Sequence, residues 1–186
     1  GRNFPTRPFF GDTHVHTSSS FDAVAFGNRL GPEDAYRFAR GEEVVSSTGV
    51  PAKLSRPLDF LVVADHSESM GTLGDVMAGT PMVMTDPTVR RWHEMLKHGG
   101  EAAMKVYYEI IAAVGGGGKL PTVLTEPRYI RSVWQRQIAA AEKYNEPGRF
   151  TAFIGYEWSS NAKGNNLHRV VIFRDNADKA SQTVPV

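Results

Sequence analysis

The chain has 186 residues, of which 41% are hydrophobic and 22% are charged, and its formal net charge is +1. This composition is typical of a globular domain that can bury a core. It offers neither an apolar window of about 18 residues for a membrane span nor a basic stripe for nucleic acid. The chain has no cysteine, so any bound metal must be held by His, Asp and Glu.

Strands and helices are expected to alternate along the chain, which favours an α/β architecture in a single domain over 1–186. Proline just inside a helix and glycine just after it mark several helix ends, while 42–57 and 69–85 read as irregular. In chain order we expect strand 8–16, helix 31–41, strand 58–64, helices 86–99 and 101–114, a helix starting at 125, and strands 150–157 and 167–173.

The last two expected strands are joined by a short connection. Only ten residues, 158–167, separate Glu157 from His168. A parallel crossover needs about a dozen residues or more, so an antiparallel return is favoured. The start of the fourth strand would then lie beside the end of the third, which places His168 near Glu157.

The first strand carries an acid and two imidazoles at alternate positions in Asp12-Thr13-His14-Val15-His16-Thr17. Side chains repeat with period two along a strand, so Asp12, His14 and His16 are predicted to share one face. Two imidazoles that converge on one point suit zinc, manganese or iron, and a nearby carboxylate can orient them. Alone, such a short motif can arise by chance.

Metal-competent side chains also stand at the ends of the next two strands, in Ala64-Asp65-His66 and Gly155-Tyr156-Glu157. In α/β barrels the active site is built from the carboxyl ends of several parallel strands. A site of two or three divalent ions is therefore predicted, with the candidate ligands His14, His16, Asp22, His66, Glu157 and His168.

Three further residues receive predicted roles around this site. Asp12 and Asp65 are expected to orient histidines or to take protons during catalysis. Arg169 could contact an anionic substrate, and a salt bridge at a strand edge is an equal alternative for it. An alternative for Asp22, less favoured than metal binding, is that it only caps the loop after the first strand, because Asp often bonds its own backbone.

These motifs resemble the first three motifs of the PHP superfamily, named for polymerase and histidinol phosphatase. Phe10-Gly11-Asp12-Thr13-His14-Val15-His16-Thr17 together with Asn165-Asn166-Leu167-His168-Arg169 looks like a branch of large, uncharacterised PHP-like proteins. The resemblance implies a distorted (β/α)7 barrel with a two- or three-metal centre that hydrolyses phosphoesters. Nothing after His168 matches the later ligands of that superfamily, so we expect the chain to be the N-terminal portion of such a barrel.

The favoured hypothesis is a metal-dependent hydrolase that uses a metal-bound hydroxide on a phosphoester or a related small anionic ester. A second hypothesis is a non-catalytic, metal-stabilised domain of a larger protein. A third is a hydrolase of amides or other esters, like the related amidohydrolase barrels. No nucleic-acid or membrane partner is expected, and a cytoplasmic and an exported location are both compatible with the sequence.

Overall fold

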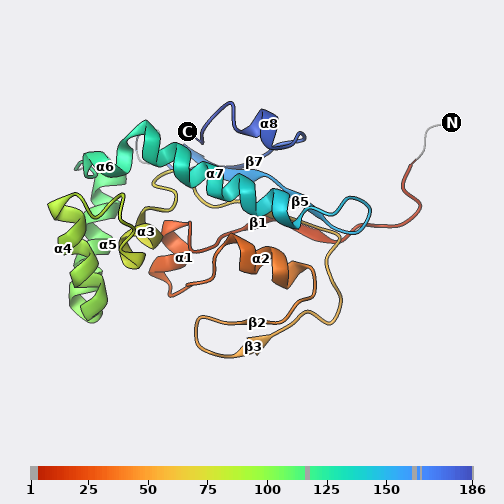
Figure 1. Ribbon diagram of the computed structural model, residues 1–186, viewed down its shortest axis with the longest axis horizontal. Coiled ribbons are helices and arrows are strands. Elements are labelled where there is room, and N and C mark those ends of the chain that lie inside the picture. The colour runs from red at the N-terminus through yellow and green to blue at the C-terminus, as the bar shows by residue number, and fades with distance from the viewer. Residues whose placement is uncertain (1–3, 116–117, 161–162, 164, 186) are drawn as a thin grey trace.

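The computed structural model describes residues 4–115, 118–160, 163 and 165–185 as a mixed α/β fold (Figure 1). The helices are α1 Phe21–Ala25, α2 Pro32–Ala39, α3 Thr72–Ala78, α4 Pro87–His98, α5 Gly100–Val114, α6 Thr122–Thr125, α7 Pro127–Tyr144 and α8 Ala177–Ala180. The strands are β1 Gly11–Val15, β2 Val44–Val45, β3 Pro51–Ala52, β4 Phe60–Val63, β5 Thr151–Phe153, β6 Gly155–Ser160 and β7 Leu167–Ile172. None of these helices is both long enough and apolar enough to cross a membrane.

A three-stranded parallel sheet in the order β1-β4-β5 lies at the centre of the fold. The central strand β4 presents Leu61, Val62 and Val63, all of them buried. This burial explains the continuous apolar run in the sequence, because a central parallel strand is covered on both faces. The prediction of a buried parallel strand here is confirmed.

The predicted (β/α)7 barrel, or the first part of one, is wrong for the described residues. Besides the parallel sheet they form two antiparallel pairs, β2-β3 and β6-β7, and these three sheets do not close into a barrel. The expected strand 150–157 instead breaks at Ile154, whose carbonyl accepts a hydrogen bond from the Phe173 amide. From there the chain leaves the parallel sheet and pairs with β7.

Gly155 makes this departure possible, because a β-carbon there would lie 2.5 Å from Val62 Cγ1 and 2.8 Å from the Val171 carbonyl oxygen. Only a hydrogen atom fits in this space. The antiparallel return of β7 is as predicted, with Glu157 opposite Val170 and Ser159 opposite His168.

Two helices, α2 and α7, pack side by side against the parallel sheet (Figure 1). Tyr36 of α2 stacks on Tyr144 of α7 with ring centroids 6.1 Å apart, and Trp134 of α7 is fully buried. The long helices α4 and α5 pack against each other at one end of the molecule (Figure 1). Each starts within one residue of its expected position. The start of α4 is fixed by Asp86, which accepts hydrogen bonds from the Thr88 and Val89 amides.

The segment 69–85 is not irregular as predicted, since it contains α3. Glycines hide this helix in the sequence: Gly71 at its N-cap and Gly79 at its C-cap both adopt the left-handed conformation. The helix is held by tertiary packing of Leu73 and Val76, which are buried. The expected loop 42–57 similarly contains the short β2-β3 hairpin.

Candidate metal centre

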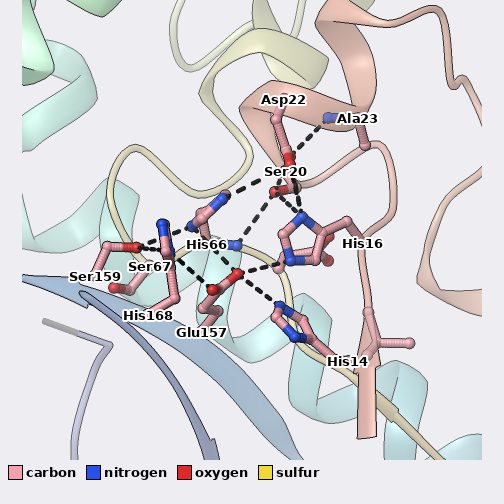
Figure 2. Close-up of polar contacts among 12 residues, drawn as sticks. His14, His16, Ser20, Asp22, Ala23, His66, Ser67, Glu157, Ser159 and His168 are labelled. Atoms are coloured by element: carbon pink, nitrogen blue, oxygen red, sulfur yellow. Dashed lines mark hydrogen bonds and ion pairs between the residues drawn. The ribbon is translucent and has the colours of Figure 1, made fainter. Parts of the chain in front are cut away.

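Four imidazoles and two carboxylates converge at the end of the sheet where β1 and β4 terminate (Figure 2). They come from the first strand and the turn after it, from α1, from the end of β4, and from the β6-β7 pair. The six residues are His14, His16, Asp22, His66, Glu157 and His168. The structure therefore brings together all the side chains that the sequence proposed as ligands.

Backbone pairing explains why Glu157 reaches this place. Although β6 has left the parallel sheet, Glu157 still forms an isolated parallel bridge with His66. The Glu157 amide donates to the Asp65 carbonyl at 2.9 Å, and the Ser67 amide donates to the Glu157 carbonyl at 2.8 Å. The carboxylate of Glu157 is thus held beside the end of β4 by main-chain hydrogen bonds on both sides of His66.

The Glu157 side chain is only 2% exposed and is surrounded by imidazoles (Figure 2). Its Oε2 lies 2.9 Å from His14 Nε2, 2.8 Å from His16 Nε2 and 3.5 Å from His66 Nδ1. Its Oε1 lies 2.9 Å from His168 Nδ1. Both carboxylate oxygens therefore face groups that can bind a metal.

Asp22 is the second carboxylate of the cluster. Its Oδ2 lies 2.9 Å from His16 Nδ1 and 3.7 Å from His66 Nε2. Its Oδ1 accepts hydrogen bonds from the Ser20 hydroxyl and the Ala23 amide, both at 2.7 Å. The first turn of α1 thus fixes the carboxylate against His16 and His66.

The donor atoms fall into three overlapping groups, within each of which they lie no more than 4.8 Å apart. The groups are His14-His16-Glu157, His16-Asp22-His66 and His66-Glu157-His168. His16, His66 and Glu157 each belong to two groups. A carboxylate such as Glu157 can bind two ions, whereas a neutral imidazole has one lone pair and binds one ion, so Glu157 is the donor that two neighbouring ions could share.

The environment of His16 fits a metal ligand. Its Nε2 is buried and makes no hydrogen bond, although Glu157 Oε2 lies 2.8 Å away. Donor atoms bound about 2.0–2.1 Å from one ion, at angles of about 90–109°, lie roughly 2.9–3.4 Å apart. The spacing and the orphaned nitrogen therefore suit two ligands that face a common ion.

The charge state of the cluster also suits a cation. Burial raises the pKa of Glu157, but the hydrogen bond with His14 and the charges of nearby histidines outweigh it and leave that pKa below its usual range. Burial likewise raises the pKa of Asp22, and bonds from Ser20 and His16 bring it below normal. Burial lowers the pKa of His66, which favours the neutral imidazole that a metal needs.

Within the described residues, no Lys or Arg forms an ion pair with either carboxylate of the cluster. The charged partners of Asp22 and Glu157 are histidines. Buried charges are normally paired or coordinate a metal. A divalent ion would therefore balance the buried carboxylate of Glu157 while leaving the imidazoles neutral.

Asp65 lies behind the cluster and is fully buried. Its carboxylate accepts bonds from the Thr17 amide, from the Thr17 hydroxyl at 2.8 Å and from Gln137 Nε2 at 3.2 Å. Burial raises its pKa to about 6, and the Thr17 bonds oppose this rise. Asp65 thus ties the backbone after His16 to the end of β4 and to α7.

Asp12 and Arg169 are not brought to the cluster. A register shift between Asp12 and Val15 interrupts the strand alternation, and Asp12 Oδ1 accepts a bond from the His14 amide at 2.8 Å. Arg169 pairs with Trp158 in the β6-β7 ladder, so it lies on the face opposite His168. Its guanidinium donates to the His168 carbonyl at 3.3 Å.

Two residues beside the cluster, Ser159 and Glu68, were not predicted from the sequence. Ser159 Oγ lies 3.2 Å from His66 Nδ1 and 2.9 Å from His168 Nδ1. Glu68 Oε1 accepts from the Ser159 amide at 2.9 Å, and its Oε2 lies 3.8 Å from His66 Nδ1. Ser159 could have been predicted from the sequence, because it follows Glu157 by two positions on β6 and side chains two positions apart point to the same face of a strand.

Fold and site together define an α/β domain with a histidine- and carboxylate-rich cluster that could hold metal ions. The chain belongs to the family described as "Protein of unknown function (DUF3604)", which it matches over residues 3–186. No curated protein and no solved structure gives a significant match.

Proposed function

We propose that this protein is a metal-dependent hydrolase and that its substrate is a phosphoester. The observation that carries the proposal is the set of three overlapping donor groups that share His16, His66 and Glu157. The resemblance of the histidine and Gly-Tyr-Glu motifs to the PHP superfamily supports phosphoesters over amides or sulfate esters. The donor set itself would serve any of these substrates.

Divalent ions bound here would polarise an ester and lower the pKa of a coordinated water. His14, His16 and Glu157 would hold one ion, and His66, His168 and Glu157 would hold a second ion beside it. In this arrangement Asp22 would hold the ring of His16 through Nδ1 and so direct Nε2 of that ring toward the ion. Such outer contacts fix the direction of a ligand's lone pair.

Elemental analysis of the purified protein for zinc, manganese and iron tests the proposal, together with turnover of 4-nitrophenyl phosphate, 4-nitrophenyl sulfate and 4-nitroacetanilide. We expect at least one ion per chain and metal-dependent turnover of the phosphate. His14→Ala should lose both, whereas His98→Ala, a change at an exposed histidine of α4, should lose neither. Full metal content and full activity in His14→Ala would falsify the assignment.

The second candidate is a metal-stabilised domain without catalysis. The wide separation of the donor residues along the chain favours it. They come from segments far apart in the chain, such as His14 and Glu157, which are 143 residues apart. An ion at hundredfold excess over its Kd would stabilise the folded state by about 2.7 kcal/mol. Under this alternative, chelation would lower the melting temperature while no ester is turned over at any metal loading.

A further inference from the structure

A cavity of about 280 Å³ opens directly beside the cluster. Asp22, His66 and His168 line the side that faces the metal-competent groups. The volume lies at the small end of the range for small-molecule sites, which is roughly 300–1,000 Å³. A molecule that reacts at the cluster would place its neighbouring atoms in this cavity.

The opposite wall is apolar and is built by α5 and α1. Ile110, Ile111 and Val114 come from α5, and Phe21 comes from α1. Phe21 and Tyr107 pack edge to face with ring centroids 6.2 Å apart, and this contact joins α1 to α5. Ile111 is 52% exposed and Val114 is 36% exposed, so their apolar surface is free for a ligand.

The charge of the lining is acidic. Asp22 and Glu68 both face the cavity, and the described residues that line it include no Lys or Arg. Two divalent ions could balance one anionic reacting group at the cluster. A second anionic group placed in the cavity would meet Glu68 without a compensating cation, and like charges at short range repel.

We propose that this cavity selects an ester whose group next to the reacting centre is apolar, aryl or aliphatic, and carries no second negative charge. The inference rests on the proposed function, because the cluster defines where the substrate reacts. It adds the class of substrate: an apolar alcohol or phenol ester, in preference to a sugar phosphate or a nucleotide. The α5 wall supplies affinity and Glu68 supplies the discrimination.

Binding of non-hydrolysable phosphonates to the metal-loaded protein tests this directly. Methylphosphonate, phenylphosphonate and 4-carboxyphenylphosphonate share a head group and differ only in size and charge. By calorimetric titration we expect phenylphosphonate to bind at least about tenfold tighter than methylphosphonate, because it buries an apolar ring. The added carboxylate should reduce affinity at least about tenfold.

A matched pair of variants on α5 locates the effect. Ile111→Ser should lower the preference for phenylphosphonate over methylphosphonate at least about threefold. Met104→Ser changes a side chain of the same helix that is 43% exposed and does not line the cavity, so it should leave the preference unchanged. Glu68→Gln should recover affinity for the carboxylated probe.

Equal binding of the methyl and phenyl probes, absence of binding by both, or an equal effect of the two α5 variants would overturn the proposal. These outcomes are separate from failure of the proposed function. A protein that binds phenylphosphonate selectively but turns over no ester would retain the apolar site and refute hydrolysis. Turnover without apolar preference would retain hydrolysis and refute the site.

Discussion

Two largely buried carboxylates of this protein, Asp75 and Glu157, have charged partners of different kinds. Asp75 of α3 has a side chain that is 13% exposed, and it contacts Arg136 at 2.6 Å, the Tyr129 hydroxyl at 2.9 Å and the Thr80 hydroxyl at 3.0 Å. Glu157 is more deeply buried and faces imidazoles. Asp75 has a permanent cation within the chain, whereas Glu157 has partners that are cationic only when protonated.

Under the proposed function, this difference separates an acid that holds the fold together from one that would bind a metal ion. The guanidinium of Arg136 stays charged at any ordinary pH, so the Asp75 site is balanced by the protein itself. The imidazoles around Glu157 can be neutral, and then the cluster lacks positive charge. Under the proposed function, the Glu157 region would depend on a bound ion and the Asp75 region would not.

The largest effect is expected for Glu157→Gln. The change removes a charged donor from two of the three groups, so metal content should fall below about a tenth of wild type and hydrolysis by at least about 100-fold, beyond the usual 10–100-fold loss for an outer partner. Elemental analysis and steady-state kinetics measure both. Glu101→Gln, at a side chain that is 86% exposed, is the control. If Glu157→Gln retained its metal, the proposed difference between Glu157 and Asp75 would be wrong.

A smaller effect is expected for Asp65→Asn. An amide can still bond the Thr17 amide and hydroxyl, but it then directs an N–H group at Gln137 Nε2, which also donates. Displacement of the backbone after His16 should weaken metal affinity about 10–100-fold. Competition with a chromogenic chelator measures this loss. An unchanged affinity would limit Asp65 to a purely structural role, like that of Asp75.

Asp75→Asn should act on stability alone. Loss of the charged partner of Arg136 and Tyr129 should lower the free energy of unfolding by about 1–3 kcal/mol. Urea denaturation measures this cost, and metal content per folded chain should be unchanged. Loss of metal in this variant would show that the two regions are coupled.

The smallest effect is expected for Arg169→Ala. Because Arg169 lies on the face of β7 opposite His168, kcat/KM should stay within about twofold of wild type. Arg174→Ala, at a side chain that is 91% exposed, is the matched control. A tenfold rise in KM for Arg169→Ala alone would restore the predicted substrate contact.

Local signals predicted much of the secondary structure. Asp86 and Pro87 indicate the start of α4, and the apolar run before Ala64 indicates the central strand. Both patterns involve only residues that are neighbours in the sequence. The predicted barrel is wrong for the described residues, and local signals could not have shown this. The break at Ile154 depends on the fit of Gly155 between Val62 and Val171, which only the tertiary structure shows.

The candidate site was more accessible to the sequence than the fold was. Its donors are residue types that divalent ions favour as ligands, and His14, His16 and His66 lie at or just after the ends of β1 and β4, where the parallel sheet brings them together. The contacts that orient them were not accessible. Gln137 reaches Asp65 from 72 residues away, and Glu68 meets Ser159 across 91 residues, so no local pattern marks them.

The long separation between donors has a consequence for how the protein matures. His14 and Glu157 meet at 2.9 Å although 143 residues separate them. Contacts of such range close late in folding, because the entropy lost on loop closure is recovered only when the intervening elements have packed. Under the proposed function, capture of an ion by the full set of donors would therefore mark the end of folding, and it would follow the departure of His168 from the ribosome.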